Sequence, residues 1–261
     1  MVEIQALSKR YEVDDGEIVA LSSTSLTIEE GEFVCLLGPS GCGKSTLLKI
    51  VAGLIEPTGG SIRINGRQVT GPGPDRAVVF QDYALFPWMT VADNVEFGLA
   101  ARGVDTARRQ AVSAELLKAV GLADFATKYP HHLSGGMKQR VSIARALAVE
   151  PVLLLMDEPF GALDAQTRYV MQQELLRIWS AYRKTVLFVT HSIDEALYLG
   201  DRVVIMTARP GRIKEDVRIT QDRPRDISGI EFGKLRKQAM DLLSEEIVRS
   251  MAQEMPAERP T

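Results

Sequence analysis

The sequence predicts an α/β fold whose core is a mainly parallel β-sheet. Short apolar runs of strand length, rich in Leu and Val, alternate along the chain with longer stretches of helical periodicity. Strands that are buried on both faces show such continuous apolar runs, and the intervening helices cover the two faces of the sheet. An earlier segment with Leu26 and Ile28 before a Gly31 turn alternates instead, which predicts an antiparallel β layer beside the parallel core.

The apolar runs and the helical periodicity also predict where the individual strands and helices lie. The turn signal Asn65-Gly66 closes one strand and predicts a hairpin. The expected strands are residues 33–37, 61–64, 77–80, 152–156, 186–190 and 203–206, and the expected helices are residues 45–53, 107–120, 135–149 and 165–183. After Thr220 the composition changes, and we expect a linker at 223–226, an amphipathic helix at 232–251 and a frayed end at 255–261.

Composition narrows the class of protein. Of 261 residues, 45% are hydrophobic and 25% charged, which is typical of a soluble globular chain. With 34 acidic and 31 basic residues, the net charge of −3 gives no electrostatic reason to expect nucleic acid as a partner. No apolar run approaches the roughly 18 residues of a membrane span, and the N-terminus lacks the apolar core of a signal peptide. The two cysteines favour a reducing compartment.

A glycine-rich loop stands between the strand at 33–37 and the helix that follows it, and it matches the pattern GxxxxGK[ST]. Its glycines let backbone amides converge on phosphate oxygens, and the helix adds its positive dipole end. The lysine suits the β- and γ-phosphates, and the serine suits Mg²⁺. The alternative is a tight turn with an incidental lysine. It does not explain why a strand precedes the loop and a helix follows it. The predicted nucleotide-binding residues of this loop are Gly38, Pro39, Ser40, Gly41, Cys42, Gly43, Lys44, Ser45 and Thr46.

The two cysteines have different predicted environments. Cys42 lies inside the loop, so its side chain is expected to face either phosphate or solvent and to be open to alkylation. Cys35 lies in the apolar strand and is expected to be a small buried residue.

A second apolar strand ends in Asp157 and Glu158, at the carboxyl edge of the sheet where α/β proteins bind ligands. Asp157 suits support of Mg²⁺, whereas Glu158 can orient or deprotonate an attacking water. A solvated acidic strand end is the alternative. His191 also follows an apolar strand, and taken alone such a histidine is more often structural than catalytic.

A further phosphate-binding device is predicted at Leu133-Ser-Gly-Gly-Met137. Ser134 is a natural N-cap for the next helix, and Gly135 and Gly136 leave backbone amides open to an anion. A well-capped helix without a ligand is the alternative for this segment taken alone.

Together these motifs resemble the ABC ATPase cassette, a P-loop NTPase fold with a helical subdomain. In chain order the resemblance covers the aromatic Tyr11, the Walker A loop at 38–45, the Q-loop residue Gln81, the signature motif at 133–137, the Walker B strand at 153–158, the D-loop ending at Asp164 and the switch histidine His191. The resemblance implies an ATPase domain over residues 1–220, with its helical subdomain at about 88–150, followed by a linker and helical tail at 221–261.

The resemblance also implies how the site works. Tyr11 would stack on adenine, and ATP held by Lys44 and Ser45 of one subunit would be covered by the signature motif of a second copy in a head-to-tail dimer. The expected nucleotide-covering residues are Ser134, Gly135, Gly136 and Asp164. The expected catalytic residues are Glu158, His191, Gln81 and Lys44. The expected Mg²⁺ ligands are Ser45, Gln81 and Asp157.

Three segments are similar to the nitrate/sulfonate/taurine branch of importers, namely residues 86–94, 158–164 and 208–212. Met137 departs from the glutamine that many family members carry, although it lies one step beyond the phosphate-facing groups. The resemblance implies uptake of a small solute, nitrate or a sulfonate such as taurine, with bicarbonate and thiamine-precursor pyrimidines as alternatives. A soluble ABC ATPase that acts outside transport and an exporter motor are the competing classes.

The resemblance further implies partners and a location. Integral membrane permease subunits are expected to dock near 82–88, where Phe86 and Trp88 either form an exposed patch or pack beneath the helical subdomain. A solute-binding protein would act indirectly, and the chain would lie on the cytoplasmic face of the plasma membrane. The stretch after Thr220 is too short for the β-barrel regulatory domain of sugar-importer motors.

Overall fold

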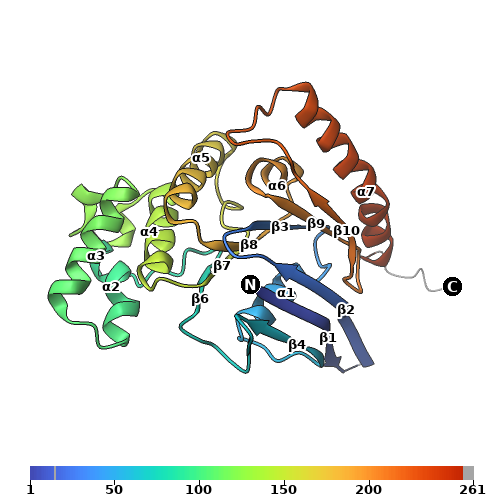
Figure 1. Ribbon diagram of the computed structural model, residues 1–261, viewed down its shortest axis with the longest axis horizontal. Coiled ribbons are helices and arrows are strands. Elements are labelled where there is room, and N and C mark those ends of the chain that lie inside the picture. The colour runs from blue at the N-terminus through green and yellow to red at the C-terminus, as the bar shows by residue number, and fades with distance from the viewer. Residues whose placement is uncertain (15, 255–261) are drawn as a thin grey trace, which may run out of the picture. The chain divides into compact units, whose positions relative to one another are not determined.

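The computed structural model describes residues 1–14 and 16–254, with side chains up to residue 250. The chain divides into two compact units, one formed by Met1–Pro72 together with the chain from Leu187 onward, and the other by Gly73–Val186 (Figure 1). The phosphate loop and His191 belong to the first unit. The acidic strand end and the signature motif belong to the second.

An antiparallel sheet makes up one part of the first unit. Its strands follow the order β2-β1-β4-β5, and Asn65-Gly66 closes the hairpin in which Ile64 pairs with Arg67. This confirms both the antiparallel layer and the hairpin. The strands are β1 (Val2–Val13), β2 (Gly16–Ile28), β4 (Gly59–Ile64) and β5 (Arg67–Gln68).

A second group of strands in the first unit holds the apolar core, in the order β10-β9-β3-β8. Strand β3 runs parallel to β9, and β10 pairs antiparallel with β9 at the edge. All five residues of β3 are buried, and the ring of Phe33 lies 5.8 Å from that of Phe188. The strands are β3 (Phe33–Leu37), β8 (Thr185–Thr190), which begins in the second unit, β9 (Arg202–Met206) and β10 (Ile213–Arg218).

Three helices complete the first unit, namely α1 (Lys44–Val51), α6 (Ile193–Leu199) and α7 (Ile230–Glu254). Helix α6 packs on β3 and on α7, and α7 runs beside β9 (Figure 1). The amphipathic helix expected at 232–251 is confirmed, because Phe232, Ala239 and Leu243 are buried. Residues 255–261 of the predicted tail lie outside the described part of the chain.

The segment before α7, expected as a linker at 223–226, is tightly anchored. Arg225 is only 6% exposed, and its Nη1 donates hydrogen bonds to the carbonyl oxygens of Leu197 at 2.8 Å and Tyr198 at 3.0 Å. Burial lowers the pKa of Arg225 to about 10, so the guanidinium stays charged at neutral pH. This charge caps the C-terminal end of α6, where helix carbonyls lack intrahelical donors.

The second unit combines a pair of parallel strands with a cluster of helices. Strands β6 (Arg76–Val79) and β7 (Leu153–Asp157) pair in parallel. Helices α2, α3 and α4 pack on one another. The helical elements are α2 (Val91–Ala101), α3 (Thr106–Ala119), α4 (Gly135–Ala148), α5 (Ala165–Tyr182) and the 3-10 turns η1 (Ala123–Phe125) and η2 (Pro130–His132).

The parallel core strands and the four helices expected from periodicity are therefore confirmed, with ends that shift by one or two residues. The sequence reading missed α2, α6 and β10. Within the described residues, no helix combines the length and the apolar character needed to cross a bilayer.

Candidate nucleotide-binding site

The phosphate loop connects β3 to α1, and glycine conformations set its path. Gly41 and Gly43 have φ angles of +73° and +98°, in the left-handed region that favours glycine. Gly43 is the N-cap of α1 and has no side chain to bond the first-turn amides. Those amides and the positive end of the helix dipole therefore remain able to bind an anion, as phosphate binding requires.

Lys44 lies inside this loop and is only 5% exposed. Its Nζ donates hydrogen bonds to the carbonyl oxygens of Gly38 and Pro39, both at 2.8 Å. A buried ammonium needs such partners, because an unpaired charge in the interior is costly. The loop thus encloses a positive charge at the position where the sequence predicts the β- and γ-phosphates.

The structure corrects the expectation for Cys42, whose side chain is 1% exposed and does not face solvent. Its Sγ lies 3.8 Å from Lys44 Nζ and 2.9 Å from the place that a Cβ on Gly38 would take. The loop folds the thiol inward because Gly38 has no side chain there. Burial raises the pKa of the Cys42 thiol, and a thiol that is 1% exposed is not open to alkylation in this conformation, contrary to the expectation. Cys35 is fully buried, as expected.

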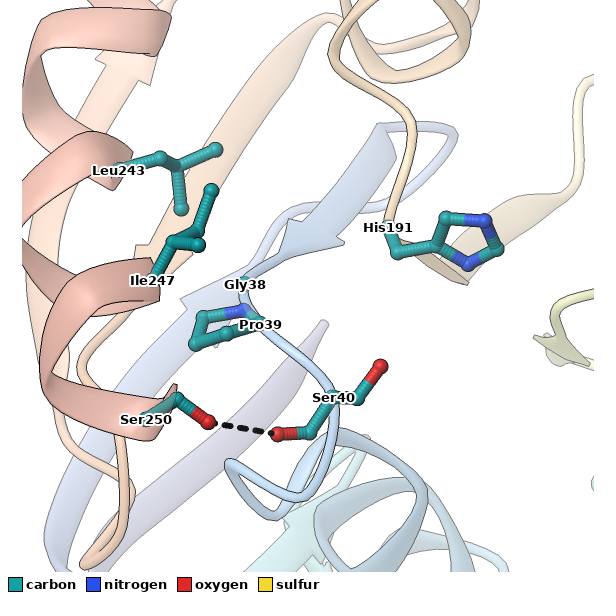
Figure 2. A pocket seen from close by; sticks show the side chains of 7 residues that line it. All are labelled: Gly38, Pro39, Ser40, His191, Leu243, Ile247 and Ser250. Carbon is teal, nitrogen blue, oxygen red and sulfur yellow. Dashed lines mark hydrogen bonds between the residues drawn. The ribbon is translucent and has the colours of Figure 1, made fainter. Parts of the chain in front are cut away.

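A cavity of about 320 Å³ lies beside the loop (Figure 2). His191, which follows β8 directly, lines this cavity together with the loop, while its catalytic role stays a prediction. The sequence reading missed the contribution of α7, although its spacing of i, i+4 and i+7 was a usable signal. The lining residues are Gly38, Pro39, Ser40, His191, Leu243, Ile247 and Ser250.

Tyr11 lies on β1 of the same unit, opposite Ile18 of β2. Its ring is partly exposed, and Lys9 Nζ lies 5.1 Å from the ring centroid. An exposed aromatic face can stack on a base, but the role of Tyr11 toward adenine stays a prediction.

In the second unit, Asp157 is the last residue of β7 and Glu158 follows it with φ of +45°. Glu158 opens a turn in which Gly161 N donates to the Glu158 carbonyl oxygen at 3.0 Å. Gln81 lies beside this turn, because its Nε2 is 3.3 Å from where a Cβ on Gly161 would stand. The structure thus brings together Gln81 and the Glu158 turn, two of the predicted catalytic positions.

The signature segment forms the start of α4. Ser134 is the N-cap, as predicted, and its Oγ accepts a hydrogen bond from Met137 N at 3.3 Å. A groove of about 370 Å³ runs between the first turns of α4 and α5. It is lined by Ser134, Gly136, Met137, Arg140, Gln166, Thr167, Val170, Met171 and Glu174.

Two helix starts meet at this groove. Asp164 is the N-cap of α5, and its Oδ1 accepts from Gln166 N at 3.1 Å and Thr167 N at 3.0 Å. The hydrogen bonds from Thr167 lower the pKa of Asp164. Gly136 has no room for a larger side chain without a shift, since a Cβ would lie 3.2 Å from the Thr167 methyl group.

Arg145 is a residue of this unit that the sequence reading missed. It projects from α4, and its Nη1 and Nη2 donate to the carbonyl oxygens of Ala84 at 2.6 Å and Tyr83 at 3.0 Å. Both acceptor residues have positive φ, at +48° and +60°. Arg145 therefore holds the strained segment after Gln81 in place from the helix that carries the signature motif. In the sequence Arg145 is simply an arginine within a predicted helix, and nothing there indicates its contacts with Tyr83 and Ala84.

The predicted Mg²⁺ ligands Ser45, Gln81 and Asp157 supply a hydroxyl, an amide and a carboxylate oxygen, the donor types that Mg²⁺ prefers. Across residues 1–14 and 16–254, no group of three or more His, Cys, Asp or Glu side chains could hold a metal ion. The predicted Mg²⁺ set contains only one carboxylate, Asp157, so the absence of such a group does not test it. The Mg²⁺ site stays a prediction.

A phosphate loop with an enclosed lysine, a strand that ends in two carboxylates and a second glycine-rich helix start define a P-loop ATPase of the cassette class. The family model described as ABC transporter matches residues 21–161. The chain belongs to the ABC transporter family. It is an ATP-binding subunit of the kind that hydrolyses ATP in these transporters.

Relatives extend this match over most of the chain. The bicarbonate transport ATP-binding protein CmpD of Synechocystis sp. is 50% identical over 92% of this chain and 88% of its own. The nitrate import ATP-binding protein NrtD of the same organism is 50% identical over 84% and 82%. An uncharacterized ABC transporter ATP-binding protein of Methanocaldococcus jannaschii is 52% identical over 96% and 94%.

A solved structure with the same fold is a dimeric ATP-binding cassette in a post-hydrolysis state with ADP and Pi bound. It has a TM-score of 0.74 and 35% identity, and the match covers 85% of this chain and 100% of that one. These comparisons confirm the predicted fold, and the nitrate and bicarbonate relatives are consistent with the predicted nitrate/sulfonate/taurine branch.

Proposed function

We propose that this ATPase powers the import of a small solute through separate membrane permease subunits. The observation that carries the proposal is the 50% identity, over 84% and 92% of this chain, to ATP-binding proteins of nitrate and bicarbonate transport. Nitrate, bicarbonate and a sulfonate such as taurine are the candidate cargoes, and a thiamine-precursor pyrimidine is a further alternative. The chain would lie on the cytoplasmic face of the membrane, with its residues 1–220 as the motor domain.

In the proposed mechanism, two copies associate head to tail; the dimeric state of the cassette with a similar fold supports association in pairs. The α1 amides and Lys44 would bind the ATP phosphates of one copy, while Ser134 and Gly136 of the other would cover them. Glu158 would orient the attacking water and accept its proton. Ser45, Gln81 and Asp157 would hold Mg²⁺, which supplies charge neutralisation at the phosphates when bound.

The cargo can be tested by uptake in source cells whose only copy carries Glu158→Gln. We expect uptake of one labelled solute among nitrate, bicarbonate and taurine to fall at least about tenfold, because import cannot outpace the ATP hydrolysis that drives it. A matched control is Glu150→Gln, an exposed acid in the segment that precedes β7. Unchanged uptake of all three solutes would remove them as cargoes.

The permease would dock on an aromatic patch that we define as Phe86, Trp88 and Phe97. Trp88 is 70% exposed, while Phe86 packs on Phe97 with ring centroids 4.4 Å apart. Phe86 thus packs on the helical cluster, as one of the two sequence readings held, whereas Trp88 projects outward. The buried side chain of Asn94 fixes the segment by hydrogen bonds with Phe86 N at 2.8 Å and Phe86 O at 3.1 Å.

For the docking test, Trp88→Glu should reduce binding to permease-containing vesicles at least about tenfold, because large exposed aromatic residues dominate interface energies. Sedimentation with the vesicles measures this, and the ATPase rate of the isolated subunit should remain normal. Leu54→Glu, at another exposed apolar residue, is the control. Equal binding of the Trp88 variant and wild type would place the docking surface elsewhere.

A further inference from the structure

The C-terminal helix α7 faces the phosphate loop across the cavity and contacts it at Ser250, although the motifs give the tail no role. Leu243, Ile247 and Ser250 line the cavity whose other side is formed by Pro39 and Ser40 (Figure 2). Ser250 Oγ donates a hydrogen bond to the Ser40 carbonyl oxygen at 3.5 Å. One flank of the loop is therefore formed by a helix about 200 residues later in the chain.

A second contact supports the loop from another direction. The segment 207–212 between β9 and β10, which we call the support turn, meets the loop at two points. Arg209 Nε donates to the Gly41 carbonyl oxygen at 3.4 Å. At Gly211 a Cβ would stand only 2.0 Å from the Cys42 carbonyl oxygen, so the two backbones touch here. The support turn includes residues 208–212, which are similar in sequence to the nitrate/sulfonate/taurine branch. In this structure these residues contact the phosphate loop.

Glu246 links α7 to the support turn. The residue is 2% exposed, and its Oε2 accepts a hydrogen bond from Ala208 N at 2.9 Å. Its Oε1 accepts from Lys214 Nζ, also at 2.9 Å. Burial acts to raise the pKa of Glu246, but the bonds from Lys214 and Ala208 outweigh it and the pKa lies below its usual value. A buried, ionised carboxylate thus joins the helix, the turn and the adjacent strand.

We propose that α7 positions the phosphate loop for nucleotide, with Glu246 as the positioning residue that acts through the support turn. Phosphate binding needs several loop amides to converge on the same anion, and a glycine-rich segment alone has many other conformations. Contacts on two sides restrict those conformations before ATP arrives, which lowers the ordering cost of binding. The proposal rests on the ATP-binding role of this loop and does not depend on the cargo.

The chain provides a matched control beside Glu246. Glu245 also pairs with Lys214, at 3.2 Å, but its side chain is 76% exposed. It is Glu246 that accepts the hydrogen bond from Ala208 N of the support turn. Separate replacements of Glu245 and Glu246 therefore distinguish two effects. One is the loss of the hydrogen bond to the support turn, and the other is the loss of negative charge near Lys214.

The experiment measures ATP affinity and steady-state kinetics of the purified full chain. We expect Glu246→Ala to raise the Kd and the KM for ATP about tenfold, with kcat within about twofold of wild type, because misplaced binding groups weaken substrate capture. Glu245→Ala should change the Kd by less than about twofold. Glu246→Gln should recover part of the loss, because its amide oxygen can still accept from Ala208 N.

Wild-type ATP affinity in a folded Glu246→Ala protein would overturn the proposal, as would equal losses in the Glu245 and Glu246 variants. Thermal unfolding without nucleotide identifies a variant that fails to fold. In that case Arg209→Ala decides, since Arg209 contacts the loop from the exposed end of the turn. A rise of at least about threefold in its Kd would support the proposal, and no change would overturn it. A wild-type chain that did not bind ATP would instead contradict the ATPase role itself.

Discussion

A Glu158→Gln variant is expected to bind ATP with wild-type affinity and to hydrolyse it at least about 100-fold more slowly. A positioned general base contributes about 10²- to 10⁴-fold to such reactions, and an amide of the same shape cannot accept the proton. Glu158 stands at the end of β7 beside Gln81, at the carboxyl edge where the attacking water is expected. Phosphate release and equilibrium ATP binding, measured on one preparation, give the two quantities.

The Glu150→Gln variant provides the comparison for this experiment. Glu150 lies shortly before β7 and is exposed, so its replacement changes the net charge equally without touching the strand end. We expect its turnover to match wild type. Hydrolysis by the Glu158→Gln variant within a few-fold of wild type would remove Glu158 from the role of base and would direct attention to His191 or Asp157.

A Lys44→Ala variant is expected to lose ATP affinity by roughly 10- to 100-fold, because a hydrogen bond to a charged group contributes about 1.5–3 kcal/mol. The substitution removes the ammonium from the loop and also leaves the carbonyl oxygens of Gly38 and Pro39 without this donor. Titration with ATP by calorimetry measures the loss. Both effects act on binding, so this variant differs from Glu158→Gln, which should lose turnover alone.

Lys49→Ala is the control for the lysine, since Lys49 is an exposed residue in the last turn of the same helix. Its ATP affinity should stay within about twofold of wild type, as for most exposed charges. If Lys44→Ala bound ATP as tightly as Lys49→Ala, the ammonium enclosed by the loop would not be a phosphate ligand.

Much of the fold was predictable because its signals are local. The apolar run of β3, the glycine pattern after it and the hairpin turn at Asn65-Gly66 are each contained in fewer than ten residues. The N-cap role of Ser134 was also local, since it depends on one hydroxyl and the next three residues. Such features need no knowledge of what packs on them.

The features that were missed depend on distant parts of the chain. The burial of Cys42 follows from the absence of a side chain at Gly38, and nothing in the loop pattern gives the direction of the thiol. The anchoring of Arg225 requires the carbonyl oxygens at the end of α6. Helix α7 was expected, but its contact with the phosphate loop follows from tertiary packing, which periodicity alone does not specify.

The left-handed backbone of Glu158 has a thermodynamic consequence. A residue with a Cβ pays roughly 1–2 kcal/mol in this conformation relative to the right-handed one, which is a noticeable fraction of the net stability of a domain. The backbone that places this carboxylate therefore lowers the protein's resistance to unfolding by part of that amount. Glycine or asparagine adopts the same conformation at a lower cost. The proposed role of Glu158 as general base would account for a glutamate at this position.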